Sequence, residues 1–134
     1  MTGDKVAVRV QVEQYRELSP TQVALELAHL SRQLQKLSDD QRPLEDDAVQ
    51  AREAYTLAYA KRFMEEGGNN EERKQATIKM THDLRIAAEL AEVLVRMHVQ
   101  QVNTLKKRID IARSAAALVR AEWEIQNVNQ GHRR

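Results

Sequence analysis

The feature that most constrains this chain is one glycine pair, Gly67-Gly68, between two long helix-forming stretches that contain no other glycine. Glycine lets the backbone adopt turn conformations that other residues avoid. Each flanking stretch carries an apolar repeat with helical spacing, so each predicts a helix with one narrow apolar face. The sequence therefore predicts an all-α fold, an elongated helical hairpin closed at this pair.

The upstream stretch keeps one apolar phase over about 35 residues, with spacings of four and three and one step of seven between Leu37 and Leu44. Its members are Val23, Leu27, Leu30, Leu34, Leu37, Leu44, Ala48, Ala51, Tyr55 and Ala58. Ser19-Pro20 predicts the helix start, with serine as the N-cap and proline at the first helical position. Because Pro43 lacks a backbone donor, we expect a break or kink within residues 38–47, between helices at about 20–37 and 44–66.

The downstream stretch predicts a single helix over roughly residues 70–128, about 90 Å long. Asn69 and Glu72 have the spacing of an N-cap and its capping-box partner. We assign the seam of this helix to Leu84, Ala87, Ala91, Leu94, His98, Val102, Leu105, Ile109, Ala112, Ala116, Val119 and Trp123, with one slip near His98. His98 is interpreted as a hydrogen-bonded histidine within the seam.

The N-terminal segment, residues 1–18, is different in character. Valines alternate with other residues over positions 5–12, which is the pattern of a short β-strand. Two interpretations stay open: a strand that pairs with the same segment of another copy, or a mobile tail. Residues 19–129 form the predicted hairpin domain, and residues 130–134 a frayed tail.

Composition limits the classes of function. The alanine-rich seams and 4% aromatic content give a thin core, so we expect stabilisation by homo-oligomerisation. The residues assigned to contacts between copies are Val6, Val8, Val10, Val12, Leu27, Leu30 and Leu34. The chain has no cysteine, and no apolar run reaches the roughly 20 residues needed to cross a bilayer. We expect a cytoplasmic protein with no membrane contact.

Catalytic motifs are absent from the sequence: it has no P-loop, dinucleotide-binding fingerprint or nucleophile elbow. Glu26-x-x-His29 has the spacing of a helical metal-ligand pair, but a di-iron bundle needs two such pairs and further glutamates. We therefore predict no enzyme activity, no metal and no cofactor.

Charge distribution gives the strongest indication of function. Net charge is only +1, yet residues 96–120 carry six basic side chains against Asp110 alone. A basic stripe can follow a phosphate backbone and release its counterions, although an ordinary solvated helix surface would look similar. The candidate nucleic-acid-binding residues are Arg52, Arg62, Lys106, Lys107, Arg108 and Arg113.

From about Arg52 onward the order of features resembles the UvsY-like recombination mediators of bacteriophages. The matching pieces are Ala51-Arg52-Glu53-Ala54-Tyr55, Gly67-Gly68, Glu71-Glu72-Arg73-Lys74, and Lys106-Lys107-Arg108 through Arg113-Ser114. In that family a lysine–arginine pair ahead of the tyrosines is implicated in single-strand binding; this chain has Arg52 and, at the lysine position, Gln50. The resemblance implies an oligomer that binds single-stranded DNA and helps a recombinase replace single-strand binding protein, in the host cytoplasm if phage-encoded.

Two hypotheses of function follow. The first is a non-enzymatic, oligomeric DNA-recombination accessory protein, whose partners are itself, single-stranded DNA, a recombinase and single-strand binding protein. The second is a protein-only helical adaptor or scaffold, such as a phage-assembly or secretion-associated hairpin, which does not bind nucleic acid.

Overall fold

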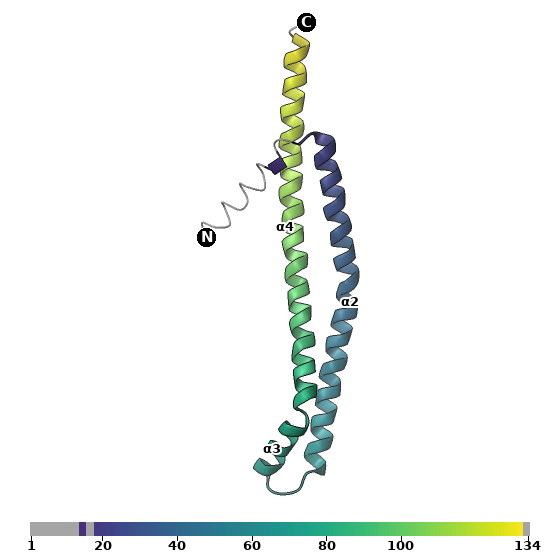
Figure 1. The fold of residues 1–134 in the computed structure, drawn as a ribbon, viewed down its shortest axis with the longest axis vertical. Helices are drawn as coiled ribbons and strands as arrows, with labels where there is room; N and C mark the ends of the chain where they lie inside the picture. The colour runs from purple at the N-terminus through teal and green to yellow at the C-terminus, as the bar shows by residue number, and fades with distance from the viewer. Residues whose placement is uncertain (1–13, 16–17, 133–134) are drawn as a thin grey trace. The chain divides into compact units, whose positions relative to one another are not determined.

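The computed structural model describes residues 14–15 and 18–132, and this part of the chain is all-α (Figure 1). Its helices are α2 (Pro20–Glu65), α3 (Asn70–Met80) and α4 (His82–His132). The valines of the predicted strand, Val6 to Val12, lie outside the described residues. α4 extends past its predicted end at about residue 128.

The contacts divide the chain into two units. The first joins the chain up to Lys36 with residues from Val102 onward, and the second comprises Leu37–Gln101. In the first unit, Val23 of α2 packs with Ala116 and Val119 of α4. In the second, the chain reverses direction through residues 66–69, so that α2 and α4 contact each other as antiparallel helices. The predicted turn at the glycine pair is confirmed.

The start of α2 is fixed by a reciprocal pair of hydrogen bonds. The backbone N–H of Gln22 donates to Ser19 Oγ at 3.2 Å, and the N–H of Ser19 donates to Gln22 Oε1 at 2.8 Å. These bonds form a capping box that satisfies donors which have no partner within the helix. The predicted N-cap at Ser19, with Pro20 as the first helical residue, is confirmed.

The predicted division into two helices near Pro43 is wrong, because α2 continues through this residue as one helix. Proline removes one backbone hydrogen bond and disfavours helical geometry in the preceding residue. The apolar stripe keeps its phase on both sides, and both Leu30 and Ala48 are buried. Burial of this stripe outweighs the local cost of the proline.

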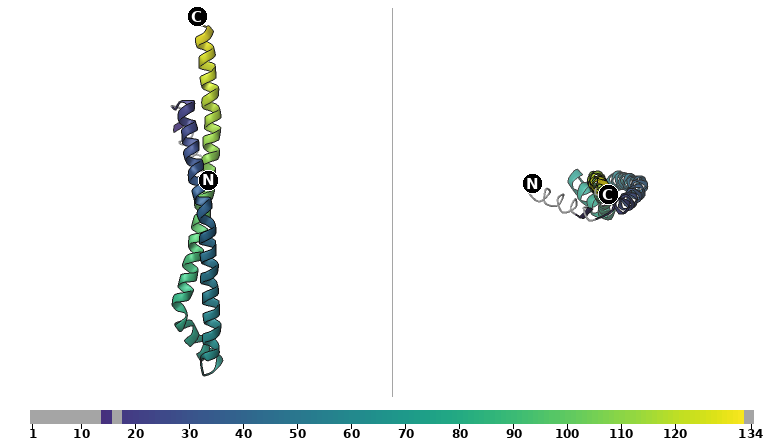
Figure 2. Two further views of the ribbon diagram at one scale, coloured as in Figure 1. Left: turned by 90° about the vertical axis from the view of Figure 1, so that its right-hand side faces the viewer. Right: turned by 90° about the horizontal axis from the view of Figure 1, so that it is seen from above.

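The single downstream helix that we predicted is also wrong, because Thr81 separates α3 from α4. The Thr81 hydroxyl and the Thr81 N–H both donate to the carbonyl of Thr77, at 2.7 and 3.0 Å. A hydroxyl that bonds back to the preceding turn bends a helix. As a result α3 turns away from the direction of α4 (Figures 1 and 2).

The seam predicted for α4 is confirmed from His98 to Val119. Toward the N-terminal end of the helix the prediction is wrong. Leu84 and Leu94, predicted inside, are 40% and 53% exposed, and Ala87 is exposed as well. At the other end Trp123 is also exposed. The observed seam follows Ala88, Ala91, Val95, His98, Val102, Leu105, Ile109, Ala112, Ala116 and Val119, and Ala115 beside it is buried as well.

This register alternates between three and four residues without the slip that we assumed. In the second unit it turns small residues of α4 inward, while α2 contributes the half-buried rings of Tyr55, Tyr59 and Phe63. Small side chains opposite large ones let two helices approach closely. The larger apolar side chains of this part of α4, including Leu90, Leu94 and Met97, lie on its other face and are at least half exposed.

His98 has the role that the sequence indicated. It is buried, and its Nε2 forms a hydrogen bond with the carbonyl oxygen of Leu37 at 2.5 Å. The bond joins α4 to α2 within the second unit.

Candidate nucleic-acid interface

Charge is divided unevenly between the two units. Residues 37–101 hold 9 of the 21 basic and 13 of the 20 acidic residues, a net charge of −4. The remaining 12 basic and 7 acidic residues give the rest of the chain a net charge of +5, which accounts for the total of +1. A near-neutral total therefore conceals one acidic and one basic part.

In the basic unit, three side chains of α4 recur at intervals of seven residues: Lys106, Arg113 and Arg120. Seven residues are close to two helical turns, so these side chains share one face at a spacing of about 10.5 Å. All three are exposed. We call this set the basic stripe.

The packing of α4 determines where the basic stripe points. Leu105, Ile109 and Ala112 are buried, and each member of the stripe follows a buried residue by one position. The seam therefore fixes the stripe beside the α2–α4 contact of the first unit, with its charged groups in water.

Hydrogen bonding leaves most of the stripe's donor groups available to a ligand. Arg113 Nη1 lies 4.0 Å from Asp110 Oδ1, and both side chains are at least 70% exposed. Arg120 Nε donates to the carbonyl of Ala116 at 3.5 Å. Exposed ion pairs of this kind contribute little to stability and can exchange for a phosphate.

Lys107 and Arg108 are exposed but lie on other sides of α4. Arg108 is near enough to Tyr15 for its positive charge to affect the pKa of the Tyr15 hydroxyl. Burial of that hydroxyl, followed by the negative charge of Glu26, raises the pKa of Tyr15, and the positive charge of Arg108 opposes this rise. Arg108 therefore lies on the side of α4 toward Tyr15.

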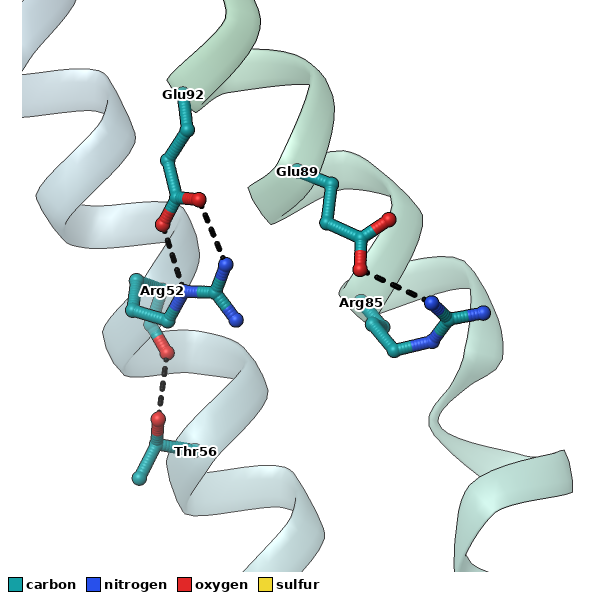
Figure 3. A network of polar contacts seen from close by, with 5 residues as sticks. All are labelled: Arg52, Thr56, Arg85, Glu89 and Glu92. Atoms are coloured by element: carbon teal, nitrogen blue, oxygen red, sulfur yellow. Dashed lines mark hydrogen bonds and ion pairs between the residues drawn. The ribbon is translucent and has the colours of Figure 1, made fainter.

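Arg52, the residue that carries the family resemblance, is held by an ion pair within the second unit. Its Nε and Nη2 donate to Glu92 Oε1 and Oε2, each at 2.8 Å (Figure 3). This pairing raises the pKa of Arg52 and lowers the pKa of Glu92. A bidentate pair of this geometry uses the donors that a phosphate would need.

Two basic residues near the turn, Arg62 and Arg73, interact with the C-terminal end of α2. Arg62 is exposed in the last turn, where a cation meets the negative end of the helix dipole. Arg73 of α3 donates to the carbonyl of Phe63 at 3.1 and 2.7 Å, and its guanidinium lies 4.6 Å from the centre of the Phe63 ring. Arg73 thus satisfies a carbonyl that has no partner within α2.

The aromatic residues pack on one another along α2. The rings of Tyr55 and Tyr59 meet edge to face at 6.1 Å, and those of Tyr59 and Phe63 are stacked at 6.4 Å. All three are half-buried. They belong to the packed face of the second unit, in agreement with the seam position that we predicted for Tyr55.

Four of the six candidate residues, Lys106, Lys107, Arg108 and Arg113, lie on one segment of α4, and two of them, Lys106 and Arg113, share a face. Arg52 and Arg62 belong to the other, acidic unit. Arg120 was missing from the candidate set. The seven-residue spacing from Lys106 and Arg113 was the signal that could have identified it.

Neither a metal site nor a membrane-spanning segment is found among the residues that the structure describes. None of the clusters of histidine and carboxylate side chains there reaches the three groups needed to hold a metal ion. His29 is exposed and Glu26 half-buried. No helix in this part of the chain has a long enough apolar stretch to cross a bilayer.

Comparison with protein-family models, with curated proteins and with solved structures gives no match.

Proposed function

We propose that this protein is an oligomeric accessory factor of homologous recombination that binds single-stranded DNA in the cytoplasm. In this role it helps to load a recombinase in place of single-strand binding protein. The observation that carries the proposal is the basic stripe of α4, in the half of the chain with an excess of positive charge. The resemblance to UvsY-like mediators supports the choice of single strands and of recombination.

The mode of binding follows from the side chains present. Lysine and arginine at regular intervals attract phosphates without reading sequence. The tyrosines that could stack on bases are half-buried in the other unit. Binding is therefore expected to be phosphate-directed, tolerant of sequence and sensitive to salt.

A salt titration with matched charge variants tests the proposal. The probe is a fluorescent oligothymidine, and the readout is anisotropy as a function of protein and salt concentration. Each lost phosphate contact should reduce the slope of log affinity against log salt by roughly 0.7 on a single strand. In the triple variant Lys106→Glu, Arg113→Glu, Arg120→Glu, the magnitude of this slope should therefore fall by about 2. The variant should also lose most of its affinity for the oligonucleotide at low salt.

The control makes the same change in charge on the acidic unit. Arg42, Lys61 and Lys74 are all exposed, and their replacement by glutamate should leave the slope nearly unchanged. If both triple variants lose affinity equally, the effect is one of net charge and the stripe is not the site. If the unmodified protein does not bind at low salt, the proposal is wrong.

The second candidate function, a protein-only adaptor or scaffold, is favoured by a different observation. Several large apolar side chains of α4, including Leu90, Leu94, Met97 and Leu118, are at least half exposed. Large exposed apolar surfaces indicate contacts with other proteins. An adaptor would show these contacts and leave the oligonucleotide free.

A further inference from the structure

The face of α4 turned away from α2 in the second unit has the pattern of a helix–helix interface. Ile86, Leu90, Val93 and Met97 are spaced by four, three and four residues, and Leu94 widens the stripe. We call these five residues the outer stripe. The seam residues Ala88 and Val95 occupy the opposite side of the same helix segment, which is the side that packs within the chain.

Exposure of the outer stripe is continuous. Each of its members is at least 37% exposed, and Leu90 reaches 59%. An apolar strip of this length at heptad spacing is the surface that a coiled-coil partner buries. Isolated exposed apolar residues need no explanation, but a periodic group does.

The charges beside the outer stripe favour a second copy of this chain as the occupant. Glu89 and Arg96 lie seven residues apart on one flank of the stripe. Glu89 also accepts a hydrogen bond from Arg85 of its own helix at 3.0 Å (Figure 3), an exposed pair that contributes little to stability and can exchange. Suppose that two copies of α4 pack as antiparallel helices, related by a two-fold axis that passes between Leu90 and Val93. Leu90 of each copy then lies beside Val93 of the other. The same axis brings Glu89 of each copy toward Arg96 of the other, which gives two ion pairs of opposite charge.

A parallel arrangement lacks this complementarity. It would place Glu89 and Arg96 near Leu94 and Gln101 of the second copy, with no pairing of charge. Two-fold symmetry also requires one surface to complement itself, and opposite charges on either side of the axis meet that requirement.

We infer that the outer stripe is a self-association surface, through which two copies of the protein pair as antiparallel helices. The inference deepens the proposed function, since it rests on the expectation of an oligomer and names the surface that forms it. It also replaces the seam that we had assigned to contacts between copies. Leu30 is buried within the chain, and Leu27 and Leu34 are half-buried there.

Sedimentation velocity over a concentration series, without DNA, tests the surface. The unmodified protein should associate, and Leu90→Glu should raise the dissociation constant at least ~100-fold because each interface would bury two unpaired carboxylates. Leu57→Glu is the matched control, since Leu57 is 71% exposed on α2 and should leave association unchanged. Far-ultraviolet circular dichroism checks that both variants stay helical.

The orientation has its own test because the sequence contains no cysteine. A mixture of Leu90→Cys and Val93→Cys proteins should form the mixed disulfide in preference to either homodimer. Glu89→Arg should weaken association, and the double variant Glu89→Arg, Arg96→Glu should restore it.

Three results would overturn the inference: a monomer at all concentrations, equal effects of Leu90→Glu and Leu57→Glu, or dominant Leu90→Cys homodimers. The anisotropy titration measures DNA binding separately. If the protein is monomeric but still binds the oligonucleotide, the self-association surface is wrong and the proposal of phosphate binding stands.

Discussion

At the scale of single residues, the turn that reverses the chain depends on Gly68 and much less on Gly67. Gly68 has a φ of +98°, a region that L-residues with a side chain rarely adopt. A Cβ at this position would also lie 2.3 Å from Glu72 Oε2. That carboxylate can move away, so most of the cost of adding a side chain comes from the backbone.

We expect Gly68→Ala to lower the free energy of unfolding by about 1–2 kcal/mol, the cost of a left-handed conformation. Gly67→Ala is the control, because nothing lies within 4 Å of its added Cβ and its φ is not positive. It should be neutral or stabilising by up to ~1 kcal/mol. Urea denaturation followed by circular dichroism measures both, and equal effects would show that the turn does not need this conformation.

The ion pair between Arg52 and Glu92 makes stability depend on pH. Its hydrogen bonds lower the pKa of Glu92 below the ordinary value of 4.5. A carboxyl whose pKa is lower in the folded state stabilises the fold above its unfolded pKa. That contribution is lost as the pH falls from 4.5 through the folded value.

We therefore expect the free energy of unfolding to fall with acidification below about pH 4.5, and to fall less steeply in Glu92→Gln. Thermal or urea denaturation at a series of pH values gives the two profiles. Parallel profiles would mean that this pair contributes nothing to the acid sensitivity. Since both groups are well exposed, high salt should reduce the difference.

At the scale of the elements, α2 shows that a proline need not end a helix. Pro43 stands inside a helix of 46 residues whose apolar face is packed before and after it. The proline therefore weakens α2 locally, and a residue with an N–H group would restore the missing backbone hydrogen bond.

We expect Pro43→Ala to raise the free energy of unfolding by ~1–2 kcal/mol. Alanine favours the helix interior over proline by roughly 3 kcal/mol. The expected gain is smaller because replacing proline also gives the unfolded chain more conformational freedom. Pro20→Ala is the control, because the first helical position tolerates proline, and its effect should be small. A loss of stability in Pro43→Ala would show that packing requires the geometry that the proline imposes.

The bend at Thr81 is the opposite case, in which no glycine or proline marks the interruption. Thr77 and Thr81 are both buried, and their hydroxyls donate to the carbonyls of Arg73 and Thr77, each at 2.7 Å. The helical pattern alone predicted a continuous helix. Two threonines four residues apart were the available signal, and only their burial shows that their hydroxyls had to turn back onto the helix.

At the scale of the whole molecule, the basic stripe and the outer stripe belong to different parts of the chain. The excess of positive charge lies outside residues 37–101, where the basic stripe is found, while the outer stripe lies within them. Nucleic-acid binding and self-association are thus proposed for different units. Variants of one surface are expected to leave the other intact, which makes the two proposals separately testable.

The sequence predicted much of the fold but less of the candidate site. The stripe of α2, the capped start at Ser19 and the turn at the glycine pair follow from local rules of spacing, capping and backbone freedom. For the site, the sequence indicated the basic segment of α4. It also suggested Arg52, whose engagement by Glu92 depends on a residue forty positions away.

What the sequence determined by itself is that this chain forms long amphipathic helices that turn back at Gly67-Gly68, because those outcomes depend on neighbours along the chain. The tertiary structure decided which face of α4 is buried, that α2 survives Pro43, and that α4 starts anew after Thr81. Each of these outcomes balances a local preference against contacts with a distant helix. In the second unit Ala88, Ala91 and Val95 of α4 are buried or half-buried, while Leu90, Leu94 and Met97 on its other face are at least half exposed.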